Sequence, residues 1–221
     1  MHIKRSKMPM TWPLPRKGKK TKFLAVPSHS FNNGISLLFV LRDMLGIVKN
    51  RKEARYMVLQ KLIKVNNKVR MDENFPLRVL DVVTIGNENL NYKLEIVNKK
   101  FKLREISEKE AGIKIVKISG KKVLGKNKIQ MNLDDGQNFL TKEKFSVGDS
   151  VIVNTKENKL EKIIPLKEGV IIEVTLGKHA GKRGKLVGFE NLPREKNYIV
   201  KIEDREVPLP YKAILAVENG K

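Results

Sequence analysis

The chain has 221 residues, no cysteine, and 46 Lys and Arg residues against 24 Asp and Glu residues, giving a formal net charge of +22. The lack of cysteine excludes disulfide frameworks, thiolate nucleophiles and Cys-based zinc sites. No apolar run reaches the roughly 18–20 residues that span a bilayer, and no secretory signal is expected. The large positive charge predicts a polyanionic partner. Nucleic acid is the first candidate, ahead of an anionic membrane surface, and we expect a cytoplasmic protein.

The first segment, residues 1–36, contains cations and no carboxylate, and its four prolines forbid a continuous helix. One interpretation is a disordered solubilising tail. The charge of a single sign favours an extended basic arm that becomes ordered against phosphates, with Trp12 and Phe23 as anchors. The candidate RNA contacts of this arm are Lys4, Arg5, Arg16 and Lys17.

Two helices are predicted next. Apolar residues recur at helical spacing from Leu37 to Val48, and Gly46 is a natural C-cap. Asn50 and Glu53 match a capping box that begins a second helix. Cations in the first turns of that helix oppose its dipole, which is unfavourable unless they contact phosphate. A solvated cationic face is the alternative interpretation.

A tight hairpin is predicted at Asn66-Asn67, because asparagine tolerates the left-handed backbone conformation. It is followed by a β-rich run, residues 80–85. Together the helices and the hairpin give the main group of candidate RNA-binding residues. They are Arg42, Arg51, Lys52, Arg55, Lys61, Lys64 and Lys68.

The order of these elements resembles the small RNA-binding domain first named for ribosomal protein S4. The resemblance rests on Leu41-Arg42-Asp43, the capped Arg-containing helix, the Lys64-Val-x-Asn67 hairpin and the Asp81-Val-x-x-Ile85 strand. Asn50 replaces the usual serine, and Asn67 replaces the usual glycine of the hairpin. The resemblance implies RNA binding by the two helices and the adjacent hairpin.

Residues 93–165 are predicted to form β structure, with a hairpin at Asp134-Asp135-Gly136. The stretch Gly120–Asn127 matches the phosphate-binding pattern G-x-x-x-x-G-K except at its last place, where Asn127 supplies no hydroxyl for magnesium. A strand pattern follows where that motif requires a helix. We therefore predict a basic hairpin loop and no nucleotide cofactor.

A further unit is predicted from Gly169. Glycines at 177, 181 and 184 alternate with cations, which lets a loop turn tightly and bring its backbone close to a ligand. This stretch resembles the KOW motif of SH3-like barrels; a glycine-rich turn with solvated lysines is the alternative. Its candidate RNA contacts are Lys178, His179, Lys182 and Arg183.

The complete arrangement resembles the archaeal and eukaryotic ("e") type of small-ribosomal-subunit protein four. Supporting stretches are Trp12–Gly18, Leu80-Asp81-Val82, Asn132–Gly136, Gly148–Val151 and Gly177–Gly181. The resemblance implies an α+β, multidomain protein with an arm at 1–36, an S4-like RNA-binding domain at 37–92, a central β domain at 93–166 and a KOW barrel at 167–221. It also implies a structural, rRNA-binding constituent of the small subunit with ribosomal proteins as neighbours.

No catalytic residue, metal site or cofactor is predicted, because the histidines are far apart in sequence and show no ligand spacing. An RNA-modifying enzyme with the same two-helix domain would need a further catalytic domain, for which residues 93–221 leave too little room. A KOW-type transcription factor would leave residues 37–85 unexplained. A free RNA-binding chaperone uses the same contacts and stays open as an alternative.

Overall fold

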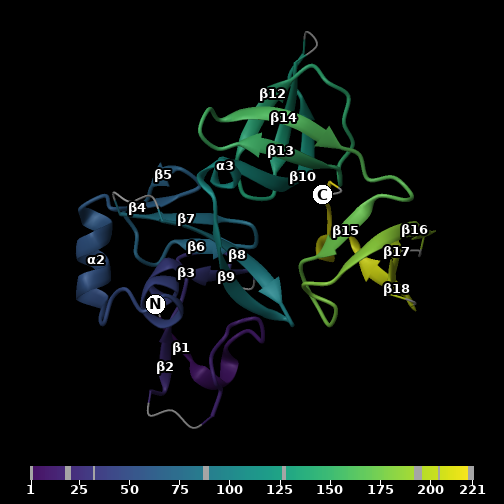
Figure 1. The fold of residues 1–221 in the computed structure, drawn as a ribbon. Coiled ribbons are helices and arrows are strands. Elements are labelled where there is room, and N and C mark those ends of the chain that lie inside the picture. The colour runs from purple at the N-terminus through teal and green to yellow at the C-terminus, as the bar shows by residue number, and fades with distance from the viewer. Residues whose placement is uncertain are drawn as a thin grey trace. The chain divides into compact units, whose positions relative to one another are not determined.

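The computed structural model shows a mostly β protein with short helices (Figure 1). The chain forms two compact units, Met1–Gly112 and Ile113–Lys221. The structure describes residues 2–17, 21–31, 33–86, 90–125, 128–191, 196–203 and 205–218.

The first unit is built on a five-stranded antiparallel sheet in the order β5-β4-β7-β8-β9, with two-stranded pairs β1-β2 and β3-β6 beside it. Its strands are β1 (His2–Lys4), β2 (Phe23–Ala25), β3 (Gly34–Ser36), β4 (Ile63–Val65), β5 (Lys68–Val69), β6 (Pro76–Arg78), β7 (Val82–Ile85), β8 (Leu90–Val97) and β9 (Lys100–Ile106). Its helical elements are η1 (Arg5–Lys7), α1 (Leu37–Phe39), η2 (Val40–Met44), α2 (Arg51–Leu59) and α3 (Glu108–Ala111).

The first predicted helix is one α-helical turn, α1, that continues as the π-helical segment η2. Gly46 adopts a left-handed φ of +68°, and the Ile47 N–H donates to the Leu41 carbonyl at 3.0 Å. The predicted glycine cap therefore ends this helix. One face of the sheet is apolar, and Ile63, Leu94 and Phe101 are among its buried side chains.

The arm packs against the rest of the first unit. Trp12 is 1% exposed, and its indole Nε1 donates to the Gly34 carbonyl at 3.1 Å. The Phe101 N–H donates to the Thr11 carbonyl at 2.8 Å. We expected an arm that becomes ordered against phosphates, but Trp12 is a core residue, because a large ring gains most from burial against apolar neighbours. Phe23, the other predicted anchor, is 50% exposed.

The boundary predicted between residues 92 and 93 falls inside β8, which pairs with β7 on one side and β9 on the other. The sheet of the first unit therefore extends to Ile106, beyond the predicted range. The prediction of β structure from residue 93 agrees with β8 and β9, but strand pairing, which decides the unit that these strands join, cannot be read from the sequence pattern.

The second unit contains two five-stranded antiparallel sheets, in the orders β12-β11-β10-β13-β14 and β18-β17-β16-β15-β19. Its elements are β10 (Ile113–Val123), β11 (Ile129–Leu133), β12 (Asn138–Thr141), β13 (Ser150–Asn154), β14 (Lys159–Ile164), β15 (Ile171–Val174), β16 (Arg183–Asn191), β17 (Lys196–Ile202), β18 (Arg205–Pro210), η3 (Tyr211–Ala213) and β19 (Ile214–Ala216).

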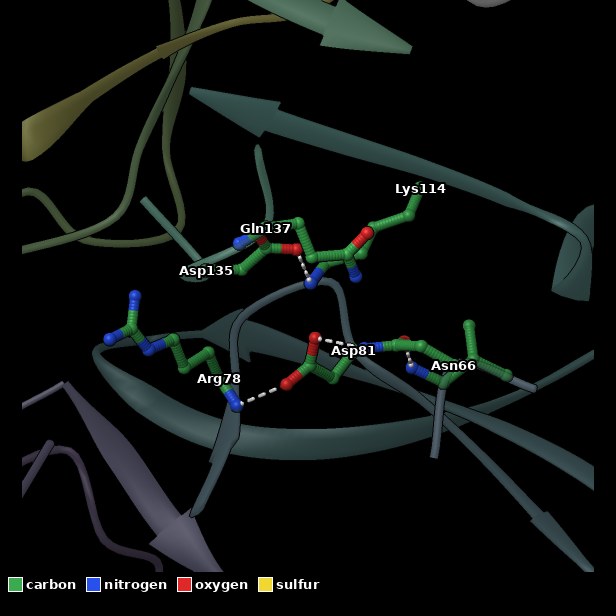
Figure 2. A network of polar contacts seen from close by, with 7 residues as sticks. Asn66, Arg78, Asp81, Lys114, Asp135 and Gln137 are labelled. Carbon is green, nitrogen blue, oxygen red and sulfur yellow. Dashed lines mark hydrogen bonds and ion pairs between the residues drawn. The ribbon is translucent and has the colours of Figure 1, made fainter. Parts of the chain in front are cut away.

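Each sheet of the second unit has its own core. Ile118, Met131 and Val151 belong to the first, and Ile172 and Val200 to the second. The predicted hairpin at Gly136 joins β11 to β12. In the turn of this hairpin, Asp135 forms an ion pair with the buried Lys114 at 3.0 Å. The Asp135 carboxylate also accepts a hydrogen bond from the Gln137 N–H at 3.1 Å (Figure 2).

A lysine and a tyrosine link the two sheets of the second unit. Lys117 of β10 donates to the carbonyls of Tyr211 and Ile214, and its Nζ lies 3.4 Å from the centroid of the Tyr211 ring. The Tyr211 hydroxyl in turn donates to the Ile118 carbonyl at 3.1 Å. Burial lowers the pKa of Lys117 to about 8 and raises the pKa of Tyr211 to about 12.

Candidate nucleic-acid interface

The predicted cap begins α2, the helix that carries three candidate cations. The Asn50 side chain accepts from the Glu53 N–H at 3.0 Å. The Glu53 carboxylate accepts from the Lys49 N–H at 2.7 Å and from Asn50 Nδ2 at 2.8 Å. The capping box is thus present with its return bond shifted by one residue, to the backbone N–H preceding the cap. The acid of the first turn is thereby held at the cap.

The cations of α2 differ in what they contact. Arg51 donates from Nε and Nη2 to one carboxylate oxygen of Glu73, at 3.1 and 2.7 Å, and the Glu73 side chain is only 10% exposed. Lys52 and Arg55 are exposed and form no ion pair within the described part of the chain. Arg42, on η2, pairs with the adjacent Asp43 at 2.7 Å. Sequence spacing grouped these cations, whereas the structure leaves two of them available for phosphate.

The hairpin after α2 is held by a buried polar cluster (Figure 2). Asn66 and Asn67 have left-handed φ values of +48° and +62°, as the hairpin prediction requires. Asn66 Nδ2 donates to the Asp81 carboxylate at 2.8 Å, and the Val82 N–H donates to Asn66 Oδ1 at 3.0 Å. The other Asp81 oxygen accepts from the Arg78 N–H at 2.7 Å. This cluster fixes the hairpin whose candidate cations are Lys61, Lys64 and Lys68, all exposed.

The sheet adds cations that the sequence did not group with this site. Across the sheet, Lys64 lies opposite Thr84, and Thr84 lies opposite Asn91. Lys93, two residues after Asn91 on β8, points to the same face and lies opposite Arg104. These residues therefore share one face of the sheet. Lys102 lies on that face too, opposite Glu95, and Arg104 forms an ion pair with Glu95 at 3.1 Å. Alternation along β8 and β9 could have grouped these cations, but placing them beside Lys64 needs the strand register.

The arm presents its cations unequally. Lys4 and Lys17 are exposed. Arg5 is 9% exposed, and its guanidinium donates to the carbonyls of Thr21 and Pro15, each at 2.9 Å. Arg16 donates to the Met8 carbonyl at 2.6 Å. The guanidinium of Arg5 therefore holds the arm together, a role that its position in a run of cations did not reveal.

The glycine-rich loop connects β15 to β16. Gly177 and Gly181 have positive φ values of +89° and +86°, and the Gly181 N–H donates to the Val174 carbonyl at 2.7 Å. Gly184 instead allows its own strand to approach the backbone of Lys201 closely, because an added Cβ would lie 2.4 Å from the Lys201 carbonyl oxygen. Gly177 and Gly181 thus allow the tight turn that was predicted, whereas Gly184 lets β16 lie close to the backbone of β17; the predicted approach to a ligand stays a prediction.

Acids partly neutralise the candidate cations of this loop. Lys182 pairs with Glu203 at 2.8 Å, and Arg183 pairs with Glu173, whose side chain is 9% exposed, at 3.1 Å. The pKa of Glu203 is lowered, first by its hydrogen bond to Lys182. Lys178 is exposed, and His179 is half-buried. A pocket of about 400 Å³ is lined by His179, Lys182, Ile202, Glu203, Arg205 and Val207.

Other kinds of site find little support in the described residues. The stretch Gly120–Asn127 begins in β10, which pairs with β11 in antiparallel fashion, as the predicted hairpin requires. Lys126 and Asn127, which belong to the predicted loop, lie outside the described residues. No group of three or more His, Cys, Asp or Glu side chains that the structure describes could hold a metal ion. No helix in that part of the chain is long and apolar enough to cross a membrane.

These features define a class of protein: a β-rich chain of several small sheets whose surface carries grouped cations suited to a polyanion. Comparison with known proteins narrows that class. The model of ribosomal family S4e matches residues 88–160. The Small ribosomal subunit protein eS4 of Methanosphaera stadtmanae is 33% identical over 208 residues, covering 93% of this chain and 86% of the relative.

The eS4 protein of Caldivirga maquilingensis is 32% identical and covers 99% of this chain and 96% of the relative. The crystal structure of the 30S ribosomal protein S4e from Thermoplasma acidophilum superposes with a TM-score of 0.71 at 24% identity. The superposition covers 84% of this chain and 95% of the other chain, and it shows that the two proteins share a fold. The chain belongs to the S4e family of ribosomal proteins.

Proposed function

We infer that the protein is a structural constituent of the small ribosomal subunit and binds ribosomal RNA there. The observation that carries the inference is its similarity, over 93% of the chain, to a protein named Small ribosomal subunit protein eS4. The exposed cations of α2 and the hairpin supply a surface for that role. Membership of the ribosome agrees with the cytoplasmic location expected from the sequence.

RNA binding by this surface would be mainly electrostatic. Lys52, Arg55, Lys61 and Lys64 are exposed and form no ion pair with the described residues, so each can neutralise a phosphate and release its counterion. Such contacts position the protein, while structured RNA is recognised by its shape, sugar hydroxyls and unpaired bases. The buried Asn66–Asp81 cluster keeps the hairpin in one conformation, which lowers the entropy lost on binding.

The cations that already have a carboxylate partner would contribute less. Arg51, Lys182 and Arg183 would have to share or exchange their acids to contact phosphate. Arg5 is committed to the carbonyls of the arm. We therefore rank Lys52, Arg55, Lys61, Lys64 and Lys178 above Arg5, Arg51, Lys182 and Arg183 as contacts.

We propose domain assignments on the same basis. The S4-like domain predicted for residues 37–92 would include β8 and β9, and the arm of residues 1–36 would be packed on it. The sheet of β10 to β14 supports a central β domain. The order β18-β17-β16-β15-β19, with η3 before the last strand, supports an SH3-like barrel with a KOW loop at 167–221. Neighbouring ribosomal proteins would be further partners.

Titration of small-subunit ribosomal RNA with the full chain tests RNA binding. If about six phosphates are neutralised, affinity should fall on the order of 10³-fold or more between 50 and 200 mM salt. The triple variant Lys52→Ala, Arg55→Ala, Lys64→Ala should bind more weakly and with a shallower salt dependence. The matched control Lys142→Ala, Lys144→Ala, Lys167→Ala removes the same charge from other exposed positions. Equal losses in both variants would show non-specific attraction and contradict the assigned surface.

A free RNA-binding chaperone, or a KOW-type transcription factor, is the alternative. The former would use the same contacts but would leave the subunit after assembly. The similarity to eS4 proteins across almost the whole chain favours the ribosomal constituent, and fractionation of ribosomal subunits separates the two.

A further inference from the structure

The outer face of α2 carries an aromatic residue that the electrostatic account leaves without a role. Tyr56 is 63% exposed, and Leu59, on the same face, is 55% exposed. Lys52 and Tyr56 are separated by one helical turn, as are Arg55 and Leu59 (four residues in each case), so the four side chains form one stripe. The opposite face is the packed one, since Ala54 and Val58 are fully buried.

The charge of this stripe has one sign. Glu53 is the one acid of α2, and its carboxylate is held at the cap by the Lys49 N–H and by Asn50 Nδ2. The guanidinium of Arg51 is turned to Glu73. Lys52 and Arg55 therefore flank Tyr56 without a carboxylate partner among the residues described.

The ring of Tyr56 also has no aromatic or cationic partner among the described residues. The aromatic and cation–π contacts of the described chain involve other rings, among them Trp12, Phe75 and Tyr211. A single exposed apolar residue is ordinary on a protein surface. An exposed aromatic ring between two unpaired cations is a more specific combination, because unpaired RNA bases stack on such rings while cations hold the adjacent phosphates.

We propose that Tyr56 stacks on an unpaired base of the ribosomal RNA, with Lys52 and Arg55 bound to the phosphates on either side. The proposal rests on the inferred rRNA binding and adds to it a contact with a base. A bulge or loop of the RNA, where a base is free of its pairing partner, is the substructure that such a contact requires. The exposed Leu59 would extend the apolar platform along the helix.

The test compares binding of small-subunit ribosomal RNA by the full chain and its variants, each at several salt concentrations. Tyr56→Ala should weaken binding about 5- to 150-fold, the equivalent of the roughly 1–3 kcal/mol of one stacked base. Tyr56→Phe, which keeps the ring, should bind nearly as well as the unchanged chain. The slope of log affinity against log salt should stay the same in Tyr56→Ala, whereas Arg55→Ala should make it shallower by about one phosphate contact.

The control is Leu140→Ala, because Leu140 is also 63% exposed but lies in the second unit; its affinity should not change. Tyr56→Leu retains apolar area without a flat π-face and should resemble Tyr56→Ala. Equal binding by the unchanged chain and Tyr56→Ala would overturn the proposal, as would a loss in Tyr56→Phe as large as in Tyr56→Ala. The proposal would also be overturned if Tyr56→Ala kept its RNA affinity but lost association with a ribosomal protein. Failure of the unchanged chain to bind any such RNA would refute the inferred function instead.

Discussion

Arg51 and Arg55 lie one turn apart on α2, but within the described part of the chain only Arg51 has a carboxylate partner. Its guanidinium makes two hydrogen bonds, of 3.1 and 2.7 Å, to an oxygen of Glu73, whose side chain is 10% exposed. Arg51→Ala leaves that carboxylate without its cation. Loss of a charged hydrogen-bond partner costs about 1–3 kcal/mol. Because the Arg51 side chain is itself 62% exposed, solvent screens the interaction. The expected loss of unfolding free energy therefore lies in the lower half of that range, at about 1–2 kcal/mol.

Arg55→Ala should leave stability within about 0.5 kcal/mol, since the residue is exposed and has no ion pair among the described residues. It should instead make the salt dependence of rRNA binding shallower by about 0.7–0.9 in slope. Urea denaturation measures the first effect and RNA titration at several salt concentrations the second.

A double-mutant cycle with Glu73→Gln provides the control for this argument. If the ion pair is the cause, the losses of Arg51→Ala and Glu73→Gln should not add, because each variant removes the same interaction. Equal destabilisation by Arg51→Ala and Arg55→Ala, or fully additive losses in the cycle, would refute the reasoning. A salt slope that Arg55→Ala does not change would remove Arg55 from the RNA-binding surface.

Three further variants test other parts of the structure. Burial lowers the pKa of Lys117 from its ordinary value of 10.5 to about 8, so between these pH values the unfolded chain binds more protons than the folded chain. The free energy of unfolding should therefore rise with pH across that window, by at most about 3 kcal/mol. Lys117→Met should remove this contribution to the rise of the urea midpoint with pH, and an identical rise in the variant would contradict it. Gly184→Ala should lower the free energy of unfolding by about 2 kcal/mol or more, because its Cβ would lie 2.4 Å from the Lys201 carbonyl oxygen. Gly188→Ala on the same strand is the control, because its Cβ would meet nothing within 4 Å. Equal melting temperatures of the two variants would disprove the steric argument. Glu203→Gln should free Lys182 and steepen the salt dependence of rRNA binding by up to about one contact; an unchanged slope would exclude Lys182 from the interface.

Local elements with strong cap and turn chemistry were predictable from the sequence. Asn50, Gly46 and the Asn66-Asn67 pair each favour one backbone conformation, and the structure has a cap, a helix end and a hairpin at these positions. Each of these features is decided by a few neighbouring residues, so no knowledge of distant contacts is needed.

Features that depend on contacts distant in sequence were missed. The prolines and cations of residues 1–36 indicated an arm that orders on RNA, but burial of Trp12 against Gly34 and its neighbours draws the segment onto the first unit. In the same way, pairing of β8 with β7 moves residues 93–106 out of the predicted central domain. Both outcomes are set by tertiary packing, which local propensity does not encode.

The candidate site was predicted as a set of cations, and its chemistry depends on which acids face them. Arg51 and Glu73 are 22 residues apart, and Lys182 and Glu203 are 21 apart. No periodicity links the members of such pairs, so the sequence could not separate the paired cations from Lys52 and Arg55. Tyr56 had a detectable signal, since it lies one turn from Lys52 on the polar face of a predicted helix.

The measurement that tests the central claim most directly is sedimentation of ribosomal subunits from cells that produce the chain, in gradients of high salt. A structural constituent of the small subunit should stay with the small-subunit peak, because its contacts are formed within the assembled particle. Release of the protein to the top of the gradient, while other small-subunit proteins stay bound, would contradict the claim and identify a free RNA-binding chaperone.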